Sequence, residues 1–307
     1  MRANWLRGIV LWLWLVMPAA AQPYFREVID IQGPTTLVRS YQGRLLVTSG
    51  RQVLLASQDG QHFQELGRLP YDRIFGLAAQ GQKIYGAFGR KGLFESDNGL
   101  EWRHIDQLEH RWVRDLESQG EDLLVATREG LFRVHDGGLD EIGQLRLGDS
   151  PQAPRIDVVS GSGAFLAAVV RGGRLFCSAD GGEHWTETAA PVPEQLEDLL
   201  VTSDGYAYVG TFSHGVGRVD CRDGSWQMLP PWNGFARVNA VWAQGQTVVA
   251  ATPTAVYRSL DGGQTWNEVR LMRAGEAIPA AGVTSFALFE GRLYAGGQFD
   301  TILRLDP

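Results

Sequence analysis

Short apolar segments recur along this chain at nearly equal distances, and their pattern is that of β-strands, with no helical period. The fourth residues of seven such segments lie at positions 47, 86, 125, 167, 209, 250 and 295, so the repeats are 39 to 45 residues apart. Nine residues before each of these positions lies another apolar residue, from Val38 in the first repeat to Phe286 in the last. This regularity predicts seven copies of one small β-sheet unit.

Each repeat contains four strand patterns separated by turns rich in Gly or Asp. In the second repeat they are residues 74–79 (IFGLAA), 83–88 (KIYGAF), 92–96 (GLFES) and 101–105 (EWRHI). Four antiparallel strands repeated every ~40 residues are typical of a β-propeller blade. We therefore predict an all-β fold in which residues 22–307 form one seven-bladed β-propeller domain. The predicted blades are about 35–69, 72–108, 111–146, 155–191, 195–230, 236–271 and 283–306.

The two ends of the repeat array complement each other. The seventh repeat stops after its third strand pattern, whereas residues 24–30 (YFREVID) resemble the fourth strands of the other repeats. We predict that this N-terminal strand completes the last blade and closes the ring. Closure would hide two sheet edges that otherwise invite aggregation.

The first 21 residues differ from the repeats. Arg2 and Arg7 precede an unbroken apolar run, Gly8 to Met17, and this run is followed by three alanines that end at Ala21. This is the pattern of a secretory signal peptide, and the run is shorter than the ~20 residues that span a membrane. We expect cleavage after Ala21, a periplasmic or secreted protein, and no membrane insertion after cleavage; a retained anchor is the alternative.

Composition narrows the function classes. The chain has 28 basic and 35 acidic residues, a net charge of −7, and this balance argues against a nucleic-acid partner. The six histidines are scattered without ligand-like spacing, so we expect no metal site and no cofactor. The two cysteines, Cys177 and Cys221, are a candidate disulfide, although equivalent edges of adjacent blades can lie beyond bonding distance. We expect a monomer.

The most specific motif lies between the third and fourth strands, where two repeats match S-x-D-x-G-x-x-W. An Asp there can accept backbone N–H groups across the turn, Gly can adopt positive φ, and the aromatic residue can cover the hairpin. The first repeat has a shorter variant that ends in Phe63. The matching residues are Ser178, Asp180, Gly182 and Trp185, then Ser259, Asp261, Gly263 and Trp266, and, in a partial match, Asp97, Gly99 and Trp102.

These residues resemble Asp-box (BNR) repeats, which occur in sialidases, in sortilin-type receptors and in propellers similar to photosystem II assembly factors. The resemblance covers the repeat architecture of the whole mature chain. It implies a structural turn at the blade periphery, because each box offers one carboxylate whereas a calcium loop supplies several oxygen ligands. The sialidase pattern also requires Ile-Pro after an N-terminal Arg, and neither Arg26 nor Arg73 is followed by it. We find no catalytic constellation, so the sequence favours a protein without enzymatic activity.

The loops at one mouth of the predicted propeller carry an unusual share of arginine. They are the loops that precede each first strand and those that join second to third strands. Arginine recognises carboxylate, sulfate or phosphate groups in pairs of hydrogen bonds, and aromatic neighbours add stacking. Alternatively, the loop arginines are ordinary solvated charges. The chain contains only two lysines, so arginine takes the place of lysine on the surface in general. The candidate ligand-binding residues are Arg51, Arg73, Arg90, Arg114, Arg128, Arg155, Arg171, Arg237, Tyr71, Trp112 and Trp232.

Two functional hypotheses follow. In the first, the protein is an extracytoplasmic interaction module, resembling the assembly-factor-like propellers, whose arginine-rich face binds an acidic segment of a protein partner or another anionic ligand. In the second, it is a carbohydrate-active enzyme or lectin acting on anionic glycans. The first is favoured because hydrolysis of a glycan needs two carboxylates at a defined separation, which no motif in this chain indicates.

Overall fold

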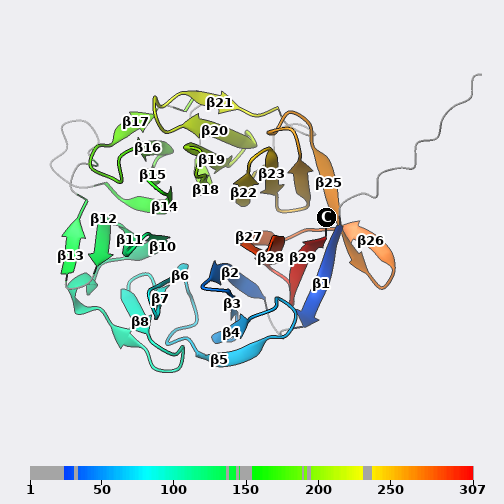
Figure 1. Ribbon diagram of the computed structural model, residues 1–307, viewed down its shortest axis with the longest axis horizontal. Coiled ribbons are helices and arrows are strands. Elements are labelled where there is room, and N and C mark those ends of the chain that lie inside the picture. Colours follow the sequence, from blue (N-terminus) through cyan, green and yellow to red (C-terminus); the bar gives the residue numbers. More distant parts are fainter. Residues whose placement is uncertain are drawn as a thin grey trace, which may run out of the picture.

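The computed structural model describes residues 24–30, 34–135, 138–142, 145, 154–188, 190–191, 195–230 and 237–306. The predicted signal peptide and Trp232 lie outside these residues. The described chain forms a seven-bladed β-propeller, as predicted, in which each blade contributes its first strand to the centre and its fourth strand to the rim (Figure 1). No helix among these residues is long and apolar enough to cross a membrane.

Five blades are separate four-stranded antiparallel sheets. From the centre outward, blade 1 is β2 (Thr35–Tyr41), β3 (Arg44–Ser49), β4 (Val53–Ser57) and β5 (Gln64–Arg68), and blade 2 is β6 (Gly76–Gln80), β7 (Lys83–Ala87), β8 (Leu93–Ser96) and β9 (Arg103–His104). Blade 3 is β10 (Val113–Gln119), β11 (Asp122–Thr127), β12 (Gly130–His135) and β13 (Gly138–Glu141), and blade 4 is β14 (Ile156–Ser162), β15 (Phe165–Val170), β16 (Arg174–Ser178) and β17 (Thr186–Thr188). Blade 5 is β18 (Leu196–Val201), β19 (Tyr206–Thr211), β20 (Val216–Asp220) and β21 (Trp226–Met228).

The ring closes through the N-terminal strand, as predicted. Blade 7 consists of β27 (Val283–Phe289), β28 (Arg292–Gly297) and β29 (Thr301–Asp306), and β1 (Tyr24–Asp30) pairs antiparallel with β29. Because Phe25 lies opposite Leu305 in this register, its side chain enters the core and is fully buried. The sheet edge of the last blade is therefore covered by the other end of the chain.

The sequence did not indicate that β1 also pairs with blade 6. Blade 6 consists of β22 (Ala240–Gln244), β23 (Thr247–Ala251), β24 (Val256–Ser259) and β25 (Asn267–Arg273), and β1 runs parallel to the second half of β25. Blades 6 and 7 consequently form one nine-stranded sheet. A further strand, β26 (Glu276–Pro279), folds back on β25 as a hairpin that projects from the rim (Figure 1).

Cross-strand register explains the nine-residue spacing in five blades. Val38 pairs with Val47, and the corresponding residues pair in blades 2, 3, 6 and 7. In blade 4 the pair with this spacing is shifted by one residue: Val159 pairs with Ala168, whereas the sequence pattern had matched Val158 with Ala167. In blade 5 a longer turn between β18 and β19 places Val209 opposite Leu199.

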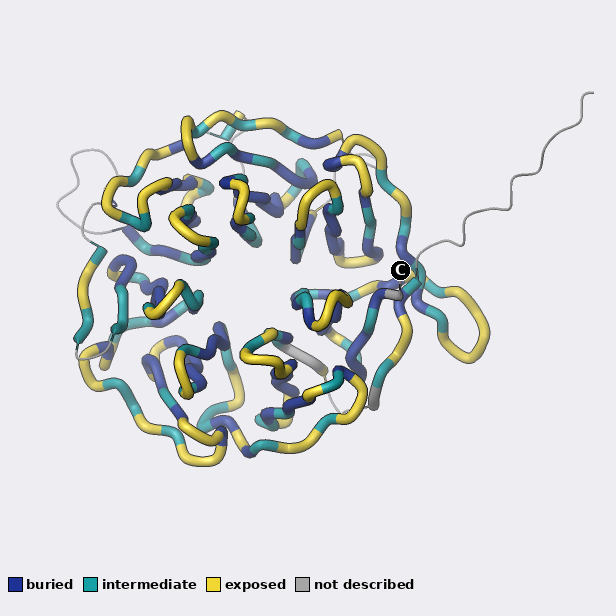
Figure 2. Tube along the Cα trace, in the orientation of Figure 1, coloured by how far each residue is buried: buried dark blue, intermediate teal, exposed yellow. Residues whose placement is uncertain are grey.

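The core consists of apolar layers between neighbouring blades. The second strands are almost completely buried, whereas the rim strands are largely exposed (Figure 2). In one such layer Leu124 of blade 3 packs with Ile156 and Leu166 of blade 4. Burial between blades is the main apolar stabilisation, because a single sheet cannot cover both of its own faces.

The box residues form the predicted turns in blades 4 and 6. In blade 6, Asp261 Oδ1 accepts hydrogen bonds from the amides of Gln264 (3.0 Å) and Thr265 (2.9 Å), and Ser259 Oγ accepts one from Gly263 (2.8 Å). Gly263 has φ of +90°, and a Cβ there would lie 2.4 Å from Leu229 of the preceding blade. Hydrogen bonds from the Thr265 hydroxyl and amide hold the pKa of Asp261 well below its usual range.

Blade 4 repeats this arrangement around Asp180. Its carboxylate accepts a hydrogen bond from the His184 amide at 3.0 Å, and Ser178 Oγ accepts one from the Gly182 amide at 2.9 Å. Trp185 Nε1 donates to the carbonyl of Gly182 in its own turn, whereas Trp266 Nε1 in blade 6 donates to Pro230 O of the preceding blade at 2.9 Å. The tryptophan of the motif can thus donate its hydrogen bond either to its own turn or to the neighbouring blade.

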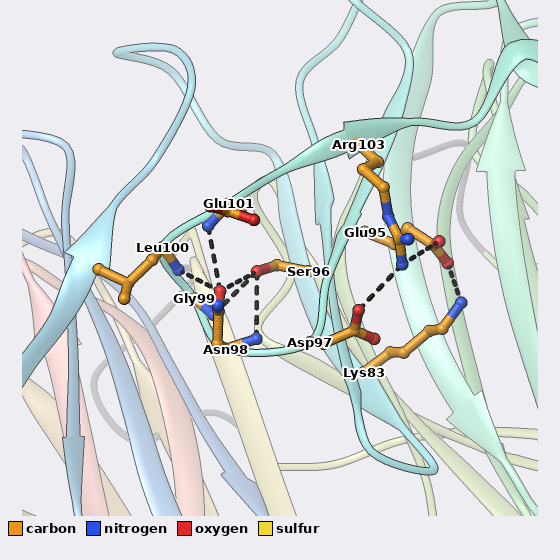
Figure 3. Close-up of polar contacts among 9 residues, drawn as sticks. All are labelled: Lys83, Glu95, Ser96, Asp97, Asn98, Gly99, Leu100, Glu101 and Arg103. Carbon is orange, nitrogen blue, oxygen red and sulfur yellow. Dashed lines mark hydrogen bonds and ion pairs between the residues drawn. The ribbon is translucent and has the colours of Figure 1, made fainter.

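In blade 2 the turn acceptor is Asn98, and the assignment of Asp97 to that role is wrong (Figure 3). Asn98 Oδ1 accepts hydrogen bonds from the amides of Leu100 (2.8 Å) and Glu101 (3.0 Å), and Ser96 Oγ accepts one from Gly99 (2.8 Å). Asp97 instead forms an ion pair with Arg103 on the surface. The turn is one residue shorter than in blades 4 and 6, so the alignment to the longer motif selected the wrong residue.

We expect Asn98→Ala to lower the free energy of unfolding by about 1–2 kcal/mol, because two amides of the turn lose their acceptor. Asp97→Ala should change it by less than about 0.5 kcal/mol, since exposed ion pairs contribute little. Urea denaturation of both variants measures the difference. Equal effects would contradict the assignment of Asn98 to the turn.

Cys177 and Cys221, the candidate disulfide, are not bonded in the structure, although their thiols share a hydrogen bond. Cys177 lies on β16 and Cys221 directly follows β20, and both side chains are buried in the apolar cluster between blades 4 and 5. Both are free thiols in the structure. A hydrogen bond with Cys221 and burial together raise the pKa of the Cys177 thiol, so this side chain remains protonated and unreactive at neutral pH.

Candidate binding face and central channel

The predicted loop sets do meet at one end of the propeller. Each first strand starts where the second strand ends, so the residues before the first strand and after the second lie side by side. The Arg128 amide donates to Trp112 O at 3.1 Å, and the Arg171 amide donates to Arg155 O at 3.1 Å. The structure thus brings together loop residues that are 16 residues apart in the chain.

Two aromatic rings form the middle of the arginine cluster. Phe75 and Trp112 contact each other edge to face, with ring centroids 6.4 Å apart. The guanidinium carbons of Arg73 and Arg114 lie 4.6 and 5.5 Å from the centroid of Phe75, and those of Arg90 and Arg128 lie 5.0 and 3.4 Å from that of Trp112. Cation–π contact orders side chains that would otherwise be mobile in solvent. Phe75 was not among the sequence candidates, because it belongs to the apolar strand pattern 74–79 and was expected in the core.

We call this cluster, from blades 2 to 4, the arginine–aromatic patch; it consists of Arg73, Phe75, Arg90, Trp112, Arg114, Arg128, Arg155 and Arg171. Its one well-placed carboxylate is Asp157, whose Oδ1 lies 3.1 Å from Arg114 Nε and 2.7 Å from Arg155 Nε. Among the described residues, no carboxylate pairs with the four other guanidinium groups of the patch. Desolvation and the positive charges of Arg155, Arg90 and Arg171 lower the pKa of Arg128. The patch therefore holds excess positive charge at short range.

Two hydrogen-bond donors of the patch have neither an acceptor nor an ion-pair partner among the described residues. Trp112 Nε1 and Arg128 Nε are both buried, and neither has a partner among the described residues. A buried donor without an acceptor costs about 1–3 kcal/mol. The cluster of arginines around Trp112 is thus unfavourable in both its charge balance and its hydrogen bonding.

The other sequence candidates lie outside the patch. Arg237 forms an ion pair with Glu197 at 2.8 Å, and its charge is thereby neutralised. Tyr71 points into blade 2, where its ring contacts Phe88 and Phe94. Arg51 lies in the β3–β4 turn of blade 1 and Trp232 lies outside the described residues. The predicted ring of arginines is thus concentrated on one side.

A second charged feature, which the sequence did not indicate, lies in the central channel. A cavity of about 370 Å³ there is lined by the side chains of Asp115, Glu117 and Asp198, with Arg39 facing them from blade 1. The Val159 amide donates to Asp115 (3.2 Å), the Gly161 amide to Glu117 (3.4 Å) and the Val241 amide to Asp198 (2.7 Å), each from the next blade. We call these three groups the channel carboxyls.

Burial raises the pKa of every channel carboxyl. The values are about 6 for Asp115, about 8 for Glu117 and about 6 for Asp198. The positive charge of Arg39 lowers the pKa of all three, whereas the charge of Asp115 adds to the rise at Glu117. Desolvation outweighs the attraction of the single arginine, so Glu117 is largely protonated at neutral pH.

The stability of the protein should therefore depend on Glu117. The folded state binds this proton more tightly than the unfolded chain does, so its contribution is present below about pH 4.5 and is lost as the pH rises through about 8. We expect Glu117→Gln to gain at least about 1 kcal/mol of stability relative to the parent at pH 8, since one pKa unit corresponds to about 1.4 kcal/mol. At pH 4.5 the two proteins should be alike. Thermal unfolding at both pH values measures this, and an equal difference at both would contradict it.

The described residues contain no group of three or more His, Cys, Asp or Glu side chains that could hold a metal ion. The arrangement offers two kinds of candidate site: a cationic, partly aromatic surface on blades 2–4 and a carboxyl-lined channel beside it.

Comparison with known proteins shows similarity of fold without similarity of sequence. No protein-family model matches the chain, and no curated protein matches it either. Among solved structures, it is similar to YCF48 bound to D1 peptide, with a TM-score of 0.71, 18% identity, and coverage of 95% of this chain and 100% of that one. YCF48 from Cyanidioschyzon merolae gives a TM-score of 0.71 at 16% identity, with coverage of 92% and 98%.

Part of a longer bacterial chain is also similar. The extracellular domain of the one-component system BT4673 from B. thetaiotaomicron matches with a TM-score of 0.70 and 13% identity. The match covers 93% of this chain and 40% of that one. The chain is thus a seven-bladed propeller similar to YCF48 and to BT4673, and its function has to be inferred from its own surface.

Proposed function

We propose that this protein is a non-catalytic interaction propeller that binds an acidic peptide segment of a partner protein on the arginine–aromatic patch. The observation that carries this proposal is the set of guanidinium groups around Phe75 and Trp112, those of Arg73, Arg90 and Arg128, which have no carboxylate partner among the described residues. Carboxylate oxygens are the natural acceptors for such donors. The aromatic rings add area for an apolar side chain of the same segment.

Two further observations support this role. One of the similar propellers, YCF48, is described in complex with a peptide. The other observation is the N-terminal segment, in which positive charge, an apolar run and three alanines follow one another as in a secretory signal peptide. We therefore propose that the protein acts outside the cytoplasm. In this view the protein guides or holds a partner, similarly to an assembly factor, and carries out no reaction.

The test is a binding assay with labelled peptides. A ten-residue peptide that alternates Glu or Asp with Leu and Phe is compared with its Gln and Asn counterpart by fluorescence anisotropy, at 20 and 300 mM salt. We expect binding of the acidic peptide only, and weaker binding at high salt, because screening reduces attraction between exposed charges. Equal binding of the two peptides, or binding of a polyuronate in preference to both, would overturn the proposal.

A further inference from the structure

The central channel contains more negative than positive charge. Seven charged side chains line its cavity: Arg39, Arg114, Asp115, Glu117, Asp157, Glu197 and Asp198. Asp157 is paired with Arg114 and Arg155, and Glu197 is paired with Arg237. The three channel carboxyls have no ion-pair partner among the described residues, and Arg39 is the one cation of the cavity left to balance them.

The channel carboxyls also lack side-chain donors. The amides described above bind one oxygen of each group, and among the described residues no side chain donates to any of the three. Held in place by backbone amides of the next blade, the carboxyl groups have fixed positions and retain acceptor capacity toward the cavity.

Two further acceptors without partners lie along the same cavity. Ser285 is only 5% exposed, and its Oγ has no hydrogen-bond partner among the described residues. Glu197 Oε1 is buried and likewise unpartnered, although Oε2 of the same group binds Arg237. Both residues line the channel. Both atoms can accept a hydrogen bond from a ligand in the cavity, and a donor with positive charge would also offset the excess of carboxyl groups there.

We infer that the channel binds one alkylammonium or alkylguanidinium group, such as the side chain of a lysine or arginine or a small free amine. A metal ion is a poor match, since no three carboxylates of the described chain are grouped to ligate one. A cavity of about 370 Å³ has room for a side chain of this kind.

The channel is accessible from the side of the arginine–aromatic patch. Phe75 and Arg114 belong to the patch and also line the channel cavity. Glu197, Asn239 and Thr284 are shared with an adjacent cavity of about 340 Å³ that includes Arg237 and Gln298. A segment bound to the patch could thus place one basic side chain in the channel. If the cation is a side chain of the bound segment, the inference rests on the proposed function. A free amine could bind in the channel without any segment on the patch.

Release of a proton from Glu117 on cation binding would distinguish a binding site from a cluster with a structural role alone. Glu117 is largely protonated at pH 7 because burial raises its pKa to about 8, with Asp115 on the same strand, Asp198 on β18 and Arg39 on β2 facing it. A bound cation favours the ionised form, so binding should release up to about one proton and should become tighter from pH 6 to pH 8.

The experiment uses two acidic peptides that differ only at one central position, lysine or norleucine, and n-butylamine as a free probe. Titration calorimetry in two buffers of different ionisation enthalpy measures affinity and proton release. We expect the lysine peptide to bind about 10-fold more tightly than the norleucine peptide, with proton release only for lysine. The double variant Glu117→Gln and Asp198→Asn should remove this 10-fold difference and leave the affinity of the norleucine peptide unchanged.

The outcomes separate the two proposals. If both peptides bind equally and butylamine does not bind, the channel site is overturned while the peptide-binding function stands. If neither peptide binds, the peptide-binding function fails, and binding of butylamine that the double variant abolishes supports a channel site for a free amine. If butylamine and the lysine peptide bind the parent and the double variant alike, the channel is not their site and the inference is wrong.

Discussion

Replacing Phe25 with alanine is expected to lower the free energy of unfolding by about 3–5 kcal/mol, the range for a large aromatic residue removed from a core. Phe25 is fully buried and packs with Leu271 of blade 6 and with Leu303 and Leu305 of blade 7. It also lies near the start of β1, at a position that pairs with β25 on one edge and with β29 on the other. Its truncation should therefore weaken the one place where the ring is closed by separate ends of the chain.

Urea denaturation and size-exclusion chromatography test this expectation together. Phe212→Ala is the matched control, because Phe212 is 49% exposed and its removal should cost less than about 1 kcal/mol. We also expect the Phe25 variant to self-associate on heating, since a loosened β1 uncovers the edges of β25 and β29. A loss below about 1 kcal/mol for Phe25→Ala would show that β1 does not hold the ring closed.

Reversing two charges of the patch, Arg90→Glu with Arg128→Glu, is expected to weaken binding of the acidic peptide by about 100-fold or more, which corresponds to about 2.7 kcal/mol. Both guanidinium groups lie over Trp112, so the change replaces attraction by repulsion at the point where the unpartnered donors lie. The fold should persist, because neither side chain has an ion pair with the described residues to lose. Anisotropy with the peptide measures binding, and thermal unfolding monitors the fold.

A matched control with the same change of net charge is Arg44→Glu with Arg292→Glu. Both residues are exposed and lie at the first turn of their blades, at the opposite end of the propeller from the patch. They should reduce affinity less than about 3-fold, through long-range attraction alone. Equal losses in the two double variants would mean that net charge, and no particular site, governs binding.

The channel carboxyls lower the stability of the folded protein. Burying carboxyl groups without charged partners is unfavourable, and it raises their pKa values. The same surface area filled by apolar residues would stabilise the ring more, as it does in the layers between blades. Retaining three acids here is therefore consistent with a ligand-binding role and is costly without one.

The sequence by itself determined the fold. Strand periodicity, turn residues and the spacing near 40 residues are local properties, and the complementary ends followed from counting strands. These features are encoded residue by residue, so the propeller, the blade number and the closing strand follow from the sequence alone.

The tertiary structure decided which polar residues act together. Asp115, Glu117 and Asp198 are on strands that read as ordinary core, and they meet only because ring geometry brings first strands from different repeats around one axis. Arg237 is neutralised by Glu197, 40 residues earlier, whereas Arg90 and Arg128 beside Trp112 have no carboxylate partner in the part of the chain that the structure describes. Charge balance, burial and the facing of side chains toward a channel depend on contacts between repeats, and a pattern read along one repeat at a time does not contain them.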